Sequence, residues 1–150
     1  FAVPRALEEA EIEDIIQRFG ETAAVAQKAG FHGVQIHGAH GYLVAQFLSP
    51  HHNRRTDRWG ASLENRSRFV MEVYREIRRR VGASFSVGIK LNSADFQRGG
   101  FDESDSVVVM QQLSDAGIDL IEVSGGTYES PAPTGARLPQ QKTTRSRELY

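Results

Sequence analysis

The stretch GVQIHGAHGY, residues 33–42, decides the fold and the search for a site. Its first part, residues 33–36, alternates aliphatic and polar side chains, which is the pattern of a β-strand with one buried face. Polar residues follow where this strand gives way to a loop: His37, then His40 three positions on, then Tyr42. Three groups that can bond or protonate an oxygen at one strand end favour a reaction on a carbonyl-bearing substrate.

Two further stretches, residues 85–92 and 118–124, repeat this alternation. In all three stretches the polar residues gather toward the C-terminal end, and they include His37, Lys90 and Ser124. This common placement predicts one shared polar site at one end of a sheet.

Three segments with apolar residues at helical spacing separate or precede these strands: residues 9–29, 63–81 and 103–116. Gly30 stands in the usual position for a helix C-terminus, and Ser62 is the expected N-cap of the second helix. Strands separated by helices require parallel pairing through right-handed crossovers.

Two α/β architectures fit this order, a doubly wound open sheet and a (β/α)8 TIM barrel. No glycine-rich GxGxxG turn follows a strand, so the usual sign of a dinucleotide-binding open sheet is missing. We favour the barrel, in which His37, Lys90 and Ser124 face one another across the C-terminal mouth.

The chain is short for such a fold. A complete barrel takes roughly 250 residues, whereas this chain has 150 and supplies three strand–helix steps. We therefore expect residues 1–150 to be the central part of a single barrel whose remaining strands lie outside it, and the native gene product to be longer on both sides. Residues 125–150, rich in Gly, Pro, Ser, Thr and Arg, are expected to form a long loop or an unfinished connection.

Composition fits a soluble cytoplasmic enzyme. The net charge of -1 implies no nucleic-acid role, and no apolar run is long enough to cross a membrane. There is no cysteine, hence no disulfide or thiolate chemistry in this segment. A basic cluster at residues 75–80 is interpreted as complementing a helix dipole. The histidines carry no HExxH spacing, so no metal site is predicted.

Three stretches together resemble the old yellow enzyme family of flavin-dependent ene-reductases and NAD(P)H:flavin oxidoreductases. They are GFHGVQIHGAHGYLVAQFLSPHHNRRTDRWGASLENRSRF (residues 30–69), SVGIKLNSADF (86–96) and IDLIEVSGG (118–126). The resemblance covers most of residues 4–126. It implies a (β/α)8 barrel that holds FMN at its C-terminal mouth, with the present strands as about the fourth to the sixth.

The resemblance also implies residue roles. His37 and His40 match the pair that binds the carbonyl or nitro oxygen of the substrate, and Tyr42 matches the tyrosine that protonates the substrate carbon. Lys90 stands where the family places a basic residue beside N1 and O2 of the flavin. The alternative for Lys90 is a purely structural role, as the partner of Glu122 in an ion pair inside the barrel.

The implied function is that of an FMN-dependent oxidoreductase which uses NAD(P)H to reduce activated C=C bonds of small, enone-like substrates. A dienoyl-CoA reductase or an NADH oxidase of the same superfamily is the enzymatic alternative. A non-catalytic barrel fragment that cannot hold FMN alone is the alternative of another class, and the isolated segment is expected to be inactive. Members of the family often form homo-oligomers.

The loop at residues 53–66 is interpreted as structural. Asp57 and a nearby arginine are expected to hold it through charge-assisted bonds. The sequence departs from the family at Trp59, where tyrosine is frequent, and at Ala61, where a second glycine is usual. We expect Ala61 to be tolerated unless the backbone there needs a positive φ.

Overall fold

The computed structural model describes residues 5–127. Residues 128–150, on which most of the predicted long loop falls, lie outside the described part. The elements in chain order are α1 (Glu9–Lys28), β1 (Gly33–Gly38), α2 (Leu43–Leu48), α3 (Leu63–Val81), β2 (Ser86–Asn92), α4 (Glu103–Asp115) and β3 (Leu120–Ser124). All three predicted strands and all three predicted helices are present, with boundaries within two residues of those expected.

Local chemistry sets the ends of the long helices. Oγ of Ser62 accepts a hydrogen bond from the backbone N–H of Asn65, which confirms Ser62 as the N-cap of α3. After α1 the chain turns at Gly30, whose φ of 87° lies in the left-handed region that glycine adopts without strain.

Helix α2 was missed by the sequence analysis, which placed a loop after β1. It has only six residues, and its residues Val44, Ala45, Phe47 and Leu48 are buried. Tertiary burial, not helical periodicity, stabilises so short a helix. A run of this length shows no readable period, which explains the error.

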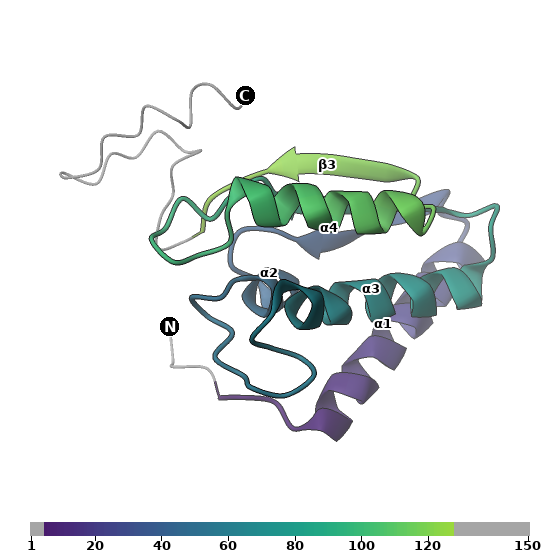
Figure 1. Cartoon of the computed structure of the whole chain (residues 1–150). Helices are drawn as coiled ribbons and strands as arrows, with labels where there is room; N and C mark the ends of the chain where they lie inside the picture. Colours follow the sequence, from purple (N-terminus) through teal and green to yellow (C-terminus); the bar gives the residue numbers. More distant parts are fainter. Residues whose placement is uncertain (1–4, 128–150) are drawn as a thin grey trace.

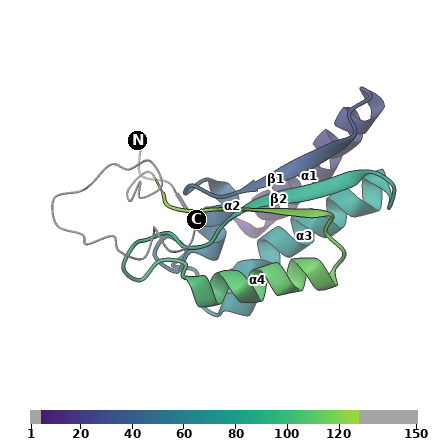
Figure 2. The same ribbon diagram turned by 90° about the horizontal axis from the view of Figure 1, so that it is seen from above.

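The three strands form a parallel sheet in the order β1-β2-β3. Ile36, Ile89 and Ile121 are register partners across it, and they belong to one face. This aliphatic face packs against the helices: α3 and α4 lie together on one side of the strands (Figure 2), and α1 packs along α3 (Figure 1). The opposite face carries the polar residues of the strands, and no helix of residues 5–127 covers it.

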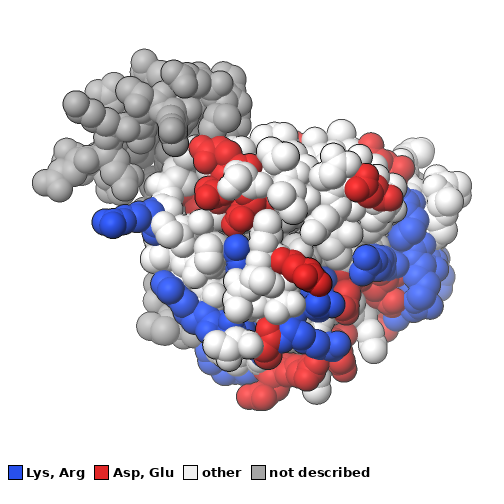
Figure 3. Space-filling model, viewed as in Figure 1, with Lys and Arg blue, Asp and Glu red and all other residues white. Residues whose placement is uncertain are grey.

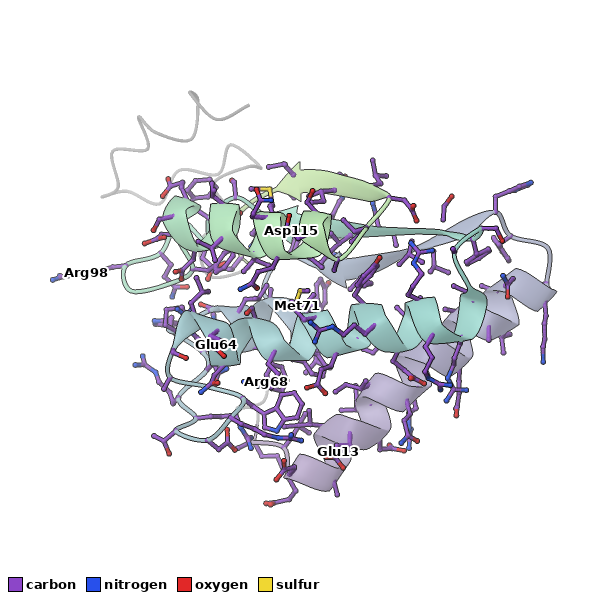
Figure 4. All side chains as sticks on the ribbon, turned by 45° about the vertical axis from the view of Figure 1, so that its right-hand side comes forward. Glu13, Glu64, Arg68, Met71, Arg98 and Asp115 are labelled. Atoms are coloured by element: carbon purple, nitrogen blue, oxygen red, sulfur yellow. The ribbon has the colours of Figure 1, made fainter. Side chains whose placement is uncertain are left out.

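Large side chains fill the layer between the helices. The rings of Phe47 and Phe69 stack with centroids 4.2 Å apart, and Trp59 is fully buried. Met71 lies between α3 and α4 (Figure 4), where it forms the floor of an outer groove of about 470 Å³ that Glu64, Arg68 and Asp115 also line. The core is therefore continuous from α1 to α4.

The loop before α3 is held by charge, as predicted. Nη2 of Arg55 lies 2.6 Å from Oδ2 of Asp57, and Nη1 of Arg55 donates to the carbonyl oxygen of Leu7. Oδ1 of Asp57 also accepts the backbone N–H of Trp59. The Arg55 guanidinium lowers the pKa of Asp57 below its usual range, so the bond keeps its ionic character at neutral pH.

Ala61 has a φ of 65°. The backbone there therefore does adopt the positive φ that we expected alanine not to tolerate. A left-handed conformation costs a residue with a Cβ roughly 1–2 kcal/mol, while glycine loses about 0.4–1 kcal/mol through a more flexible unfolded chain. We therefore expect Ala61→Gly to raise the free energy of unfolding by about 0.5–1 kcal/mol, as measured by urea denaturation of the full-length protein.

The matched control for this substitution is Ala83→Gly. Ala83 is also exposed, but its φ is not positive, so glycine should lower the stability there. If both substitutions lowered stability equally, the backbone at Ala61 would not be strained.

The basic cluster at the end of α3 binds neighbouring groups. Arg78 donates to the carbonyl oxygens of Gly82 and Phe85, which lie just beyond the helix, in agreement with a role at the helix C-terminus. Arg79 and Arg80 form ion pairs with Glu76. On the face in Figure 3, lysines and arginines are interspersed with acidic residues over the helices. Within residues 5–127, no helix has the length and apolar character needed to span a bilayer.

Candidate active site

The side chains of His37, His40 and Tyr42 meet at the C-terminal end of β1. The ring centroids of His37 and His40 are 5.4 Å apart, and those of His37 and Tyr42 are 4.9 Å apart. His37 is an exposed residue on the polar face of the sheet. The structure thus gathers the three predicted site residues around the ring of His37.

His40 is held in an uncommon backbone conformation. Its φ is 61°, and that of the following Gly41 is 78°. For a residue other than glycine this conformation costs of order 1–3 kcal/mol and persists only where surrounding contacts fix it. The backbone N–H of His40 donates to Oδ1 of Asn92 over 3.2 Å, and Nε2 lies 2.7 Å from Oγ of Ser124. A bridge to Thr127 adds a third contact.

Tyr42 is placed by the short helix that follows it. It is the N-cap residue of α2, and its side chain is 45% exposed. Val44 and Leu48 anchor α2 in the core, so the helix start is fixed relative to β1. The exposed ring of Tyr42 thus lies beside the imidazole of His37, and its phenol is a group that can donate a proton.

Lys90 lies on the polar face of the sheet and also forms an ion pair with Glu122, the two environments that the sequence analysis offered as alternatives. It is the register partner of His37 on β1 and of Glu122 on β3, which places it at the centre of the polar face. Its Nζ lies 2.9 Å from Oε1 of Glu122, so the ion pair expected for a structural role of Lys90 is present. Gln35 donates to the other oxygen of Glu122 over 2.9 Å.

Charges and burial on this face act on titratable groups in opposite directions. Lys90, and after it Gln35, lower the pKa of Glu122, which therefore stays ionised. Although much of its surface is exposed, partial desolvation lowers the pKa of His37, the neighbouring His40 and Lys90 lower it further, and Glu122 opposes them. These effects together favour the uncharged form of His37, which has one N–H donor and one acceptor nitrogen.

Asn92 is the organising residue that sequence reasoning missed, although it was one of the polar residues of the second strand. It is 1% exposed, and it connects the segments that follow β1 and β3. Oδ1 accepts the N–H of His40, while Nδ2 donates to Asp95 and to the carbonyl oxygen of Gly126. An asparagine at the end of a buried strand was the only signal in the sequence.

The other histidines lie apart from this group. His51 and His52 contact each other in the loop after α2, and Nε2 of His51 lies 3.0 Å from Nε2 of Gln97. Among residues 5–127, no three His, Asp or Glu side chains are grouped so that they could hold a metal ion.

Comparison with known proteins shows which family the chain matches. The model of the NADH:flavin oxidoreductase / NADH oxidase family matches residues 1–148. An NADH-dependent flavin oxidoreductase of Neonectria sp. (strain DH2) is 44% identical over 131 residues, which are 87% of this chain and 17% of that protein. The chain thus spans only a minor part of its relatives.

Solved structures give the same result. The chain superimposes on 2-naphthoyl-CoA reductase with a TM-score of 0.82 and 38% identity, covering 85% of this chain and 19% of that one. For the old yellow enzyme homologue from Zymomonas mobilis the TM-score is 0.76 and the identity 29%, covering 87% of this chain and 39% of that one. Because these neighbours are (β/α)8 barrels, the three parallel strands are part of such a barrel, as predicted. The chain belongs to the NADH:flavin oxidoreductase / NADH oxidase family.

Proposed function

We propose that the full-length protein is an FMN-dependent, NAD(P)H-driven reductase of activated C=C bonds in enone-like substrates. The observation that carries this proposal is the convergence of His37, His40 and Tyr42 at one strand end, beside a cation on the same sheet face. The 150-residue segment by itself is expected to be inactive, since it holds three strands of a barrel.

The residues present fit a flavin. The polar face of the sheet offers Lys90 as a cation and Gln35 as an amide, and it lies uncovered by helices of residues 5–127. A positive charge suits the N1 and O2 edge of a flavin, which becomes anionic on reduction. The ion pair with Glu122 holds Nζ of Lys90 in place and moderates its charge. When bound, FMN supplies the hydride for the alkene carbon.

The two histidines are proposed to bind the carbonyl oxygen of the substrate. Hydride addition to the β-carbon of an enone moves negative charge onto that oxygen, so donors aimed at it stabilise the transition state more than the ground state. Removing one such donor typically lowers kcat by about 10²–10³-fold. The uncharged ring of His37 supplies one N–H to this oxygen.

Tyr42 is proposed to deliver the proton that completes the reduction. Tyr42 is an exposed residue whose ring contacts that of His37, so a substrate bound by the histidines lies close to its hydroxyl. The O–H bond breaks, and the proton adds to the α-carbon as the enolate electrons form the C–H bond. The tyrosinate is then reprotonated from solvent.

The test is a titration of the full-length protein, reconstituted with FMN, with p-hydroxybenzaldehyde. A phenolate mimics the substrate oxygen, and its stacking on the flavin gives a long-wavelength charge-transfer band. We expect His37→Ala to weaken phenol binding by about 10²-fold, since a charge-assisted hydrogen bond is lost. The control is His32→Ala, which removes an exposed histidine just before the opposite end of β1.

Three outcomes of this titration count against the proposal. Phenol affinity that is the same in His37→Ala as in the wild type excludes the histidine pair as the oxygen site. An equal loss of affinity in His32→Ala shows that the effect is indirect. A protein that binds no FMN excludes the cofactor assignment.

A reductase of aromatic or unsaturated CoA thioesters is the second candidate function. It is favoured by the 38% identity to 2-naphthoyl-CoA reductase. The thioester carbonyl oxygen presents the same acceptor to His37 and His40, so the described residues serve either substrate. Steady-state kcat/KM for an enone and for an enoyl-CoA with the same carbon chain separates the two. Rapid oxygen consumption without either substrate instead supports an NADH oxidase.

A further inference from the structure

The contact between His40 and Ser124 limits what the imidazole of His40 can offer a ligand. Nε2 lies 2.7 Å from Oγ of Ser124, so this nitrogen is already in a hydrogen bond. Only Nδ1 is left for a substrate oxygen. An uncharged imidazole carries one N–H, and the partner of one nitrogen decides where that hydrogen is.

Two tautomers are compatible with the distance. If Nε2 carries the hydrogen, it donates to Ser124, and the bare lone pair of Nδ1 faces and repels an oxygen that gains negative charge. If the hydroxyl of Ser124 donates to Nε2, then Nδ1 carries the hydrogen and can bond that oxygen. Only the second tautomer is useful at the site proposed above.

We propose that Ser124 is a positioning residue that donates its hydroxyl hydrogen to Nε2 of His40 and thereby presents Nδ1–H to the substrate oxygen. The proposal rests on the proposed function, because the oxygen it concerns is that of the substrate. It gives a specific task to Ser124, the last residue of β3, which the sequence analysis placed only among the polar residues at the strand ends.

The backbone around both groups is fixed, which keeps their distance short. Ser124 is the register partner of Asn92 on β2, and its carbonyl oxygen accepts the N–H of Ser93 over 2.5 Å. Asn92 also accepts the N–H of His40 and donates to Gly126. The side chain of Asn92 thus holds the backbone of His40, and the backbone of β2 and Ser93 holds Ser124, so both partners of the contact are fixed on the same strand.

The first experiment reads the tautomer directly. The full-length protein is labelled with ¹⁵N-histidine, and the two ring-nitrogen shifts of His40, assigned through His40→Asn, are measured at pH values where the ring is uncharged. We expect a protonated Nδ1 and an unprotonated Nε2 in the wild type, and a shift toward the Nε2–H tautomer in Ser124→Ala. An Nε2–H tautomer in the wild type overturns the proposal, as does an unchanged tautomer in Ser124→Ala.

The second experiment measures phenol affinity. Ser124→Ala should weaken p-hydroxybenzaldehyde binding by about 10-fold, the size of loss typical when the partner that orients a metal-binding histidine is removed. Ser124→Thr keeps a hydroxyl and should restore most of the affinity. Ser86→Ala, at the opposite end of β2, should leave it unchanged.

A double-mutant cycle separates this role from a merely structural one. In the background His40→Asn the amide itself donates, so Ser124→Ala should no longer change phenol affinity. An equal loss in both backgrounds overturns the proposal. If no variant and no wild type binds phenol, the proposed function has failed, while the tautomer measured by NMR still decides the hydrogen bond.

Discussion

Tyr42→Phe in the full-length protein is expected to slow alkene turnover by about 10²–10⁴-fold, the usual contribution of a positioned general acid. The substitution removes the hydroxyl and keeps the ring that contacts His37, so the geometry of the site should survive. Reduction of the flavin by NAD(P)H involves no proton from this group and should continue at nearly the wild-type rate.

Stopped-flow absorbance distinguishes the two half-reactions. Flavin bleaching with NAD(P)H reports the first, and the return of the oxidised flavin band with an enone reports the second. Tyr74→Phe is the control, because it also removes a phenolic hydroxyl. The hydroxyl of Tyr74, on α3, donates to the carbonyl oxygen of Ala116 at the end of α4. A wild-type oxidative rate in Tyr42→Phe would remove Tyr42 from the mechanism.

The second large effect is expected on stability, from Arg66→Met. Arg66 is 7% exposed, and its guanidinium forms an ion pair with Asp105 at the start of α4. It also donates to the carbonyl oxygens of Leu48, at the end of α2, and of Ala61. One side chain therefore connects α2, the loop before α3, and α4.

Methionine keeps much of the apolar volume of Arg66 and removes every one of these bonds. Removing one partner of a buried ion pair typically costs about 3–5 kcal/mol. Because the Asp105 side chain is 20% exposed, we expect the free energy of unfolding to fall by about 2–3 kcal/mol. Urea denaturation of the full-length protein measures this change. The control is Arg79→Met, which removes an exposed ion pair with Glu76 and should cost less than about 1 kcal/mol. Similar losses for the two variants would show that Arg66 acts only as a surface charge.

Most of the fold could be predicted from the sequence, because the features that define its strands and helix ends are local in the chain. Alternation in residues 33–36, the N-cap at Ser62 and the glycine after α1 each act within a few residues of chain, and each is found where it was expected. Helix α2 depends on burial by distant segments, so no local pattern announces it. The positive φ at Ala61 also follows from how the loop is anchored, and residue identity alone argued against it.

In the candidate site, too, the local arrangement could be predicted from the sequence and the long-range contacts could not. The motif predicted that His37, His40 and Tyr42 lie near one another, because all three fall within six consecutive residues, 37–42. The bonds of His40 to Asn92 and Ser124 join segments far apart in sequence, and spacing cannot reveal them. For Lys90, the sequence listed Glu122 as a partner, but only the structure shows that this ion pair coexists with a place on the polar face.

The contacts of His40 with Asn92 and Ser124 have a consequence for folding during synthesis. Asn92 lies 52 residues after His40, and Ser124 lies 84 residues after it. Contacts of such long range form slowly, because the intervening chain must first lose its conformational freedom. While β3 is still inside the ribosome, the nascent chain already contains the whole histidine–tyrosine motif but lacks the contacts that hold His40 in its left-handed conformation. We therefore expect the contacts that hold His40, and with them the proposed affinity for a substrate oxygen, to form only after the third strand has docked.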